Sequence, residues 1–426
     1  MNQSSLGKIY IKKRSISEWF VLVILVFPFL FGTLFEILSL PNFVRFCMDA
    51  ILIYFLVTFA YKRTILVRRP LVPIIKFAAI FFVYTLVVYC FNFQSPFYYI
   101  WGVRNNFRFF VAFLVFAFFI DEDYANSIFK LFEVLFWVNI VVSLFQFIFM
   151  GVAQDDLGGL FGSTGSTNAY TLVFFIIMIS KSLLATFEKK ESPGYCALKC
   201  IASLVVAAMA EMKFYYFVFI ILLFLASVLT KFSRRKLVLW IVSTVAVLLG
   251  SIFLSYMFKE FENFLSLKQI WQYATNEHYS SQKDINRLSA IFTLMKNYVT
   301  EPLQQIFGMG LGNCDLSEVS IFNSVFHQKY EFLHYSWFTS AMIFLETGFL
   351  GIVIYLSFFV LCLRRALAQL KLRQGNKLYC QMTVIMALMC FVLFFYNSAL
   401  RIESGYMIYF VLALPFMAKN DQPKIG

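Results

Sequence analysis

The sequence predicts an all-α polytopic membrane protein with about twelve transmembrane helices, both termini cytoplasmic and one large external loop between the ninth and tenth helices. Two observations lead to this fold class. The 426 residues are 61% hydrophobic and 14% charged, whereas globular domains are about 45–50% apolar and about 25% charged. Apolar runs of the roughly 20 residues that a spanning helix needs also recur along the chain. No stretch resembles a soluble domain, so residues 1–426 are expected to form a single membrane domain.

The predicted helices follow the apolar runs in chain order. They lie near residues 19–39, 46–61, 72–92, 106–120, 127–150, 168–186, 197–211, 214–230, 236–257, 336–363, 378–397 and 403–418. The first run follows a basic segment, as in a signal peptide, but it is longer than a signal-peptide core and lacks a small-residue cleavage site. We interpret it as a transmembrane helix. One long broken helix over 197–230 is an open alternative to two separate helices.

Basic residues predict which helix ends face the cytoplasm. With the N-terminus inside, the cytoplasmic connections hold the basic clusters at 62–69, 189–190, 231–236 and 364–377. All of these clusters then lie on one side of the membrane, as the positive-inside rule requires. The long hydrophilic stretch that begins at residue 258 is then external.

This external loop, residues 258–335, is the leading candidate for chemistry on the water side. Within it, Leu288, Ile291, Met295 and Val299 recur at helical spacing and predict an amphipathic helix near 287–299. Asp284 is a candidate cap for the start of that helix. We expect the apolar face of the helix to lie on the membrane or on the helical bundle.

Composition and motifs argue against several functions. The net charge of +13 comes from short basic blocks between apolar runs, so no nucleic-acid partner is expected. Zinc, kinase and nucleophile-elbow motifs do not occur in the sequence, and we expect neither a metal nor a cofactor. Cys196 and Cys200 have a C-x₃-C spacing that is more typical of helix packing than of a metal site.

Cations at the predicted outer ends of helices are candidate ligands for an anion. Arg104 and Arg108 stand one helical turn apart, and Lys213 lies between two apolar runs beside Glu211. Charges at such depth are costly and usually face a partner or a water-filled cavity. One interpretation pairs Lys213 with Glu211 and lets the arginines reach lipid headgroups. The other interpretation brings these cations together with Arg287 on a phosphate or diphosphate, which the forked guanidinium suits.

His334 is the candidate acid–base residue. It lies where the hydrophilic loop enters the next apolar run, close to the membrane surface. Near neutral pH a histidine can accept a proton from an attacking hydroxyl. The other two histidines, His278 and His327, are expected to be structural.

Two glycine-rich stretches allow close approach of the backbone to a polar group. The first covers Gly158–Gly165, and the second is the run Gly308-Met309-Gly310-Leu311-Gly312. The second run lacks the GK[ST] ending of a nucleotide-binding loop. It predicts a tight turn that could admit a bulky substrate.

Taken in order, these motifs resemble the O-antigen polymerase and O-antigen ligase superfamily of bacterial surface-polysaccharide enzymes. The resemblance rests on the helix pattern, the external loop, GMGLG, the later His334 and the E-T-G-F-L-G element from Glu346 to Gly351. The stretches FGSTGSTNAY and AEMKFYYF also look like family elements. In ligases asparagine commonly follows the loop histidine, whereas Tyr335 follows it here, and this departure favours a polymerase.

The resemblance implies glycan transfer on the outer face of the bacterial inner (plasma) membrane, with undecaprenyl-diphosphate-linked oligosaccharide as donor and acceptor. His334 and Arg287 would be catalytic. The residues implied to bind the diphosphate are Arg104, Arg108, Lys213 and Arg401, and the supporting residues are Glu211, Glu346, Gly310 and Gly312. The remaining partners would be membrane lipid and a chain-length regulator.

The function expected from the sequence is polymerisation of repeat units into O-antigen, capsule or exopolysaccharide. A ligase that moves the finished glycan to lipid A core is the nearest alternative. A flippase or transporter for the same carrier lipid is less favoured, because such proteins carry charges within many spans and lack a long external loop.

Overall fold

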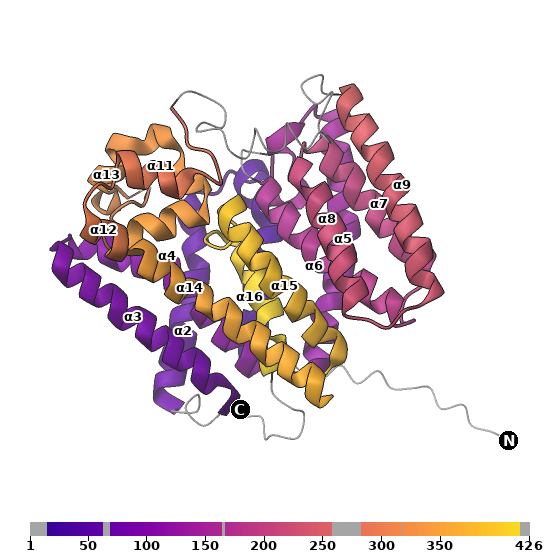
Figure 1. The fold of residues 1–426 in the computed structure, drawn as a ribbon, viewed down its shortest axis with the longest axis horizontal. Coiled ribbons are helices and arrows are strands. Elements are labelled where there is room, and N and C mark those ends of the chain that lie inside the picture. Colours follow the sequence, from indigo (N-terminus) through magenta and orange to yellow (C-terminus); the bar gives the residue numbers. More distant parts are fainter. Residues whose placement is uncertain (1–14, 63–68, 164–166, 258–282, 318, 418–426) are drawn as a thin grey trace.

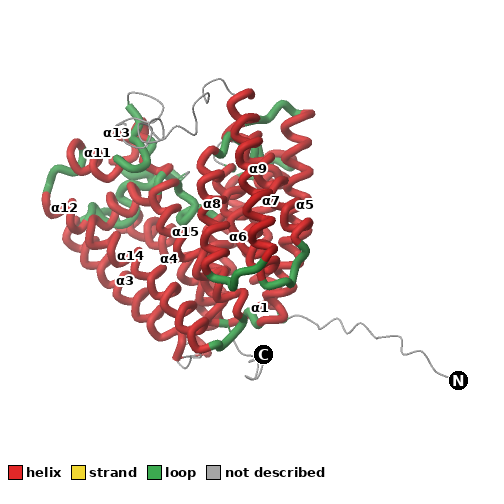
Figure 2. The backbone as a smooth tube through the Cα atoms, turned by 45° about the vertical axis from the view of Figure 1, so that its right-hand side comes forward, coloured by secondary structure: helices red, strands yellow, loops and turns green. Residues whose placement is uncertain are grey.

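The computed structural model describes residues 15–62, 69–163, 167–257, 283–317 and 319–417. In this part of the chain the backbone forms helices and connections, with no strand (Figures 1 and 2). The apolar helices are α1 (Ile16–Val26), α2 (Cys47–Lys62), α3 (Val72–Asn92), α4 (Pro96–Phe119), α5 (Glu122–Phe149), α6 (Asn168–Phe187), α7 (Pro193–Met209), α8 (Lys213–Val228), α9 (Arg234–Met257), α14 (Thr339–Leu372), α15 (Lys377–Tyr396) and α16 (Ser404–Ala413).

Each predicted apolar run overlaps one of these helices, and the protein is a membrane protein by their length and composition. Helix α4 begins at Pro96 rather than near residue 106, so Arg104 and Arg108 lie within the helix and not at its mouth. Among the described residues, 8 helices are long and apolar enough to cross a membrane. The segments around α1, α7, α8 and α16 are apolar but shorter. The coarse prediction of an all-helical membrane protein is therefore confirmed. The count of twelve spans and their sidedness stay predictions.

Two of the apolar runs differ in detail from the helices that hydropathy alone predicts. The first apolar run is not one regular helix, because α1 passes into a 3₁₀ turn, Phe27–Leu30, and a π-helical turn, Gly32–Ile37. Pro28 lies in this transition, and its ring lacks the N–H that an α-helix would use. The run 197–230 forms two helices, because Glu211 adopts a left-handed backbone (φ 53°) in the turn between α7 and α8.

Helix α6 lies at the centre of the bundle. Within its most apolar window, 94% of the residues are buried, compared with 22% for α9 at the edge. It packs against α8, α15 and α16, with Phe174 in edge contact with Phe29 and Phe132. Such aromatic packing stabilises helix association in a bilayer, where apolar surface alone gives no preference for protein over lipid.

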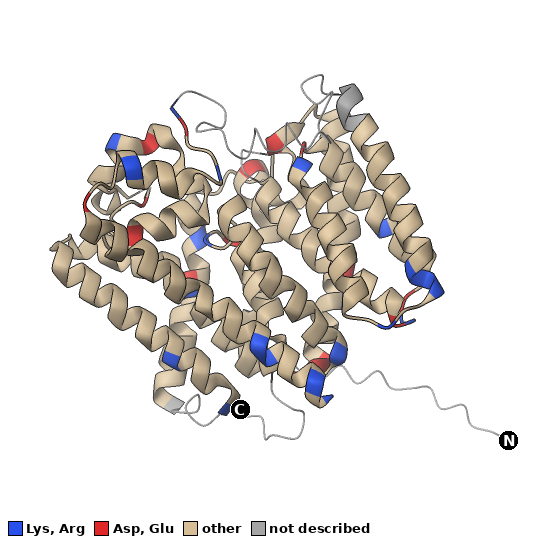
Figure 3. Ribbon diagram, viewed as in Figure 1, with Lys and Arg blue, Asp and Glu red and all other residues tan. Residues whose placement is uncertain are grey.

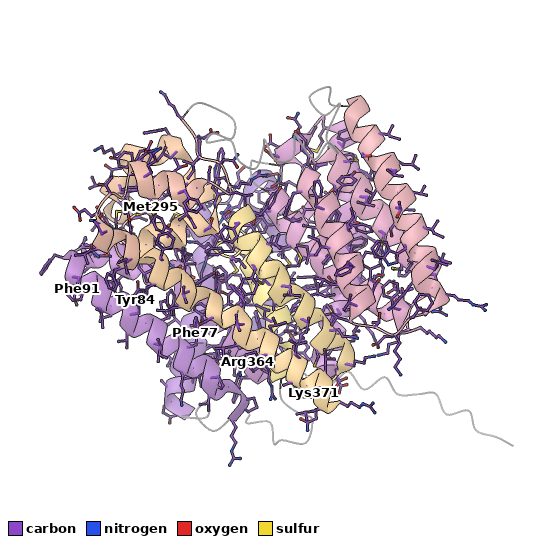
Figure 4. All side chains as sticks on the ribbon, viewed as in Figure 1. Phe77, Tyr84, Phe91, Met295, Arg364 and Lys371 are labelled. Carbon is purple, nitrogen blue, oxygen red and sulfur yellow. The ribbon has the colours of Figure 1, made fainter. Side chains whose placement is uncertain are left out.

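The loop segment and the basic end of α14 lie at opposite ends of the bundle. Three short helices form the described part of the loop: α11 (Ala290–Asn297), α12 (Pro302–Phe307) and α13 (Val325–Tyr330). Figure 4 labels Met295 of α11 near the top of the view, and Arg364 and Lys371 at the bottom of α14. In Figure 3, further Lys and Arg residues gather at the lower ends of α9 and α14.

The amphipathic helix expected near 287–299 is present but shorter. It begins at Ala290, and Ser289 rather than Asp284 occupies its N-cap position. Ala290, Ile291 and Leu294 face the protein interior. The first part of the predicted loop, residues 258–282, lies outside the described residues, as does His278.

Candidate functional site

A break in α14 is the centre of the candidate site. Gly348 has φ 63°, which interrupts the helix within an apolar span. The interruption exposes backbone carbonyls that must find other donors, because nothing in a bilayer core replaces a lost hydrogen bond. The amides of Met309 and Gly310 donate to the carbonyls of Leu345 and Glu346, at 2.8 and 3.0 Å. The glycine run and the E-T-G element are thus one structural unit.

The glycines in this run have no room for a side chain. Gly310 and Gly312 have φ 96° and 76°, in the region that L-residues rarely adopt. A Cβ on Gly310 would lie 1.6 Å from Oε1 of Gln94, and one on Gly312 would lie 1.8 Å from the carbonyl oxygen of Tyr98. The two glycines let the loop lie directly against α4 and the end of α3. In the structure, these two predicted supporting residues allow close packing of the backbone.

Glu346 connects this unit to two other parts of the chain. Its carboxylate is fully buried. Oε1 accepts from the amide of Gly312 at 2.8 Å. Oε2 accepts from Arg401 at 2.8 Å and from Asn106 of α4 at 3.1 Å. A buried carboxylate with this many donors holds the glycine loop, α4 and the α15–α16 connection in one arrangement.

Arg401 bridges two carboxylates. Its guanidinium lies 2.8 Å from Glu346 and 3.1 Å from Asp315. Asp315 also accepts from Asn105 of α4 at 2.8 Å. Burial by itself would lower the pKa of Arg401, but the negative charges of Glu346 and Asp315 outweigh burial and raise it. Arg401 is therefore a permanent cation.

Arg108 makes a second buried ion pair beside the first. It lies 3.1 Å from Glu403 and also donates to the carbonyl oxygen of Arg401 at 2.8 Å. Tyr170 of α6 donates to the other oxygen of Glu403 at 2.7 Å. Burial acts to raise the pKa of Glu403, but the charges of Arg108 and Arg45 and the hydroxyl of Tyr170 outweigh it and lower the pKa to about 2. Glu403 is ionised at any physiological pH.

Arg104, one turn earlier on α4, pairs with Asp49 of α2 at 2.7 Å. It also donates to the side chain of Asn105 at 2.7 Å. Each of the arginines Arg104, Arg108 and Arg401 thus has at least one carboxylate partner within the protein. The structure brings Arg108 and Arg401 into one network with the supporting residues Glu346 and Gly312.

The other predicted cations lie near a small cleft. Lys213 pairs with Glu211 at 3.0 Å, which is the contact expected from the simpler interpretation of this pair. The guanidinium of Arg287 lies 4.5 Å from the ring centroid of Tyr396. The ring of Tyr396 also stacks on Phe214, with ring centroids 3.8 Å apart. The cleft is small and is lined by Asn168, Ala169, Leu172, Met212, Tyr215, Tyr396 and Asn397.

One short connection links the cleft to the buried ion pairs. It runs from Asn397, which lines the cleft, to Glu403 and includes Arg401. The side chain of Asn397 accepts from the amide of Ala399, and its carbonyl accepts from Thr339 at the start of α14. The cleft and the buried ion pairs therefore share a rigid backbone between α15 and α16.

His334 lies on the segment next to that of Arg287. The amide of Ile285 donates to the carbonyl of Leu333 at 3.1 Å, which aligns the two segments. His334 has φ 52° and stacks on Trp337, with ring centroids 4.2 Å apart and planes 7° apart. The imidazole of His334 is therefore half-buried and stacked at the end of the loop.

Several residues of the site were not singled out from the sequence. Glu403, Asp49 and Tyr170 are buried polar partners of the arginines, and only Glu403 had a signal, since it stands two residues from Arg401. His327 is buried and contacts the hydroxyl of Tyr335 at 3.1 Å. That hydroxyl donates to the carbonyl of Cys314 at 2.8 Å.

No cluster of three or more potential metal ligands occurs among the described residues. No protein-family model matches this chain, and no curated protein matches it. The site is therefore interpreted from its own geometry.

Proposed function

We propose that the protein polymerises undecaprenyl-diphosphate-linked oligosaccharide repeat units into a surface polysaccharide such as O-antigen, capsule or exopolysaccharide. In this proposal it is a membrane glycosyltransferase of the bacterial inner membrane, with twelve spans, both termini cytoplasmic and residues 258–335 external. It belongs, in this proposal, to the superfamily that its motifs resemble. The single observation that carries the proposal is the concentration of cations around the α15–α16 connection, next to a helix break and a glycine loop.

A lipid diphosphate would suit these surroundings. The diphosphate is anionic and sits at the membrane surface, and its prenyl chain stays in the bilayer. Arg287 contacts Tyr396 of the small cleft and Lys213 follows Met212 of its lining, while an incoming diphosphate would compete with the carboxylate partners of Arg104, Arg108 and Arg401 for their guanidinium groups. Guanidinium groups match phosphate oxygens as forks, and lysine acts as a point charge.

The proposed reaction has one bond-forming and one bond-breaking event. A hydroxyl oxygen of the acceptor glycan attacks the anomeric carbon of the donor glycan. The bond from that carbon to the diphosphate oxygen breaks, and the diphosphate leaves with the electron pair. His334 orients the acceptor hydroxyl and takes its proton. Arg287 and the neighbouring cations stabilise the charge that develops on the leaving diphosphate.

The nearest alternative is a ligase that transfers the finished glycan to lipid A core. It would use the same donor chemistry, and the packing of Tyr335 against Cys314 favours neither acceptor. A flippase or transporter for the carrier lipid is the third possibility. Against it, the charged side chains of α4, α14 and the α15–α16 connection are paired into fixed contacts, rather than arranged along a path through the bundle.

Deletion of the gene in its own bacterium separates these three functions. Loss of a polymerase should leave surface glycan of a single repeat unit. Loss of a ligase should leave long chains on the carrier lipid, and loss of a flippase should trap single units inside the cell. Full-length chains attached normally in the deletion strain would refute the proposal.

Point variants then test the two catalytic residues. Arg287→Ala and His334→Ala should abolish chain elongation while the protein still inserts into the membrane. Lys296→Ala is the matched control for Arg287, because Lys296 is exposed on the adjacent α11. Normal chain-length ladders in both Arg287→Ala and His334→Ala would overturn the assigned roles.

A further inference from the structure

Arg45 is a cation of the candidate site that the proposed function does not yet use. It lies in the 3₁₀ turn Asn42–Phe46, directly before α2. Its half-buried guanidinium lies 5.0 Å from the ring centroid of Phe31 and 4.8 Å from that of Phe35. Contact with two aromatic rings fixes the position of the charge without neutralising it.

These two rings are themselves held in place. Phe31 is buried and packs against Tyr170 of α6, with centroids 5.8 Å apart. Phe35 lies on the π-helical turn Gly32–Ile37, and π-helical turns occur frequently at functional sites. The turn sits against the first glycine-rich stretch, since a Cβ on Gly32 would lie 3.0 Å from the Cα of Gly162. The setting of Arg45 is therefore preorganised.

Arg45 forms no direct ion pair within the part of the chain that the structure describes. Arg104, Arg108 and Arg401 each have a carboxylate partner. Arg45 makes no ion pair with the described residues, and its buried Nε has no hydrogen-bond partner there. An unsatisfied buried donor costs free energy, and an incoming acceptor would recover that cost.

Arg45 is also close to the ion-pair network. Its charge is one of those that lower the pKa of Glu403, together with the larger effect of Arg108. Glu403 already accepts from Arg108 and Tyr170, so it is not a dedicated partner for Arg45. Arg45 therefore places a positive charge near Tyr170 and Glu403 without forming an ion pair with Glu403.

We propose that Arg45 binds phosphate oxygens of a prenyl diphosphate, as a ligand that the sequence motifs do not assign. This inference rests on the proposed function, because it names a further residue for the same donor lipid. The forked guanidinium gives two parallel hydrogen bonds to one phosphate group. Arg45, which forms no ion pair with the described residues, thereby pairs with the phosphate of the bound lipid.

Binding of farnesyl diphosphate to the full-length protein in neutral phosphatidylcholine nanodiscs tests this. The wild-type protein should bind it, and Arg45→Gln should weaken binding by at least about tenfold, the loss expected for a charge-assisted hydrogen bond. Arg364→Gln is the matched control, because Arg364 is exposed near the C-terminal end of α14, away from the candidate site (Figure 4). The melting temperature of Arg45→Gln should fall only slightly, since the substitution removes two cation–π contacts but no ion pair. If Arg45 were only structural, Arg45→Gln would lower the melting temperature clearly and leave the binding of farnesyl diphosphate unchanged.

The outcomes separate this inference from the proposed function. Unchanged affinity in Arg45→Gln, with tight binding by the wild type, overturns the role of Arg45 and leaves the proposed function intact. No binding by the wild type counts against both. If Arg45→Gln does not fold, Arg45→Lys replaces it: loss of the fork should weaken binding severalfold, and unchanged affinity overturns the proposal.

Competing compounds identify the source of the phosphate. Inorganic pyrophosphate should compete weakly and farnesol should not compete, because the ligand needs both the diphosphate and the chain. Equal competition by phosphatidylglycerol would overturn the proposal in favour of an ordinary lipid-headgroup site.

Discussion

The carboxylate of Glu346 and the guanidinium of Arg401 form a buried ion pair, 2.8 Å long, that joins the broken helix α14 to the connection before α16. The two residues are 55 positions apart. Their contact also fixes the glycine loop, because Glu346 accepts from the amide of Gly312. The geometry of the candidate site therefore depends on this pair.

Glu346→Gln should destabilise the protein strongly. Removing one partner of a buried ion pair typically costs about 3–5 kcal/mol, because the other charge loses its compensation. Asp315 would still face Arg401, so we expect the lower end of this range. Thermal unfolding in detergent measures the effect. Glu301→Gln, at an exposed position, is the control and should melt like the wild type. A Glu346→Gln protein of wild-type stability would show that the pair does not hold the site together.

Gly310→Ala and Gly312→Ala should each prevent accumulation of folded protein. An added Cβ would lie 1.6 and 1.8 Å from neighbouring oxygens, and the oxygen opposite Gly312 belongs to the backbone and cannot rotate away. Overpacking alone costs about 1–3 kcal/mol, and the positive φ adds strain. The yield of monodisperse protein on size exclusion is the measurement. Gly194→Ala is the matched control, since no atom lies within 4 Å of the added Cβ.

Hydropathy and charge were enough to predict the all-helical membrane fold and the position of each apolar helix. They could not predict the break in α14, because a glycine within an apolar run is compatible with a continuous helix. The break is stabilised by hydrogen bonds from a second segment, and hydropathy does not show these bonds. Both motifs of that unit were recognised in the sequence as separate elements. Their pairing is a tertiary contact.

The arginines show the same limit. Sequence reasoning placed Arg104, Arg108 and Arg401 near the outer ends of helices, where an anion could bind. It could not predict that Asp49, Glu403 and Asp315 neutralise them, because these pairs join residues far apart in the chain or on different elements. The sequence predicted no function for Arg45. The structure singles it out because its Nε has no hydrogen-bond partner among the described residues.

Glu403 should make stability depend on acid pH. The pKa of Glu403 is about 2 in the folded protein, below the ordinary value of 4.5. A depressed pKa contributes stability that is present above pH 4.5 and is lost as the pH falls towards 2. The contribution is on the order of 3 kcal/mol. Glu403→Gln should be less stable than the wild type at pH 6 and should show a smaller further loss between pH 4.5 and 2. If Glu403→Gln lost as much stability between pH 4.5 and 2 as the wild type does, the assignment to Glu403 would be contradicted. Glu301→Gln is the control and should lose as much stability over this range as the wild type.

Arg104 and Asp49 offer a matched pair of variants that separates structure from binding. Both side chains are partly exposed, at 22% and 15%, so their ion pair should stabilise the protein by only about 1 kcal/mol. Arg104→Gln and Asp49→Asn should therefore lower the melting temperature by similar, small amounts. Their effects on binding should be opposite if Arg104 binds the donor diphosphate. Arg104→Gln should weaken binding of farnesyl diphosphate, while Asp49→Asn releases the guanidinium from its competing carboxylate and should maintain or tighten binding. Equal weakening by both variants would mean that Arg104 acts only by holding α4 against α2.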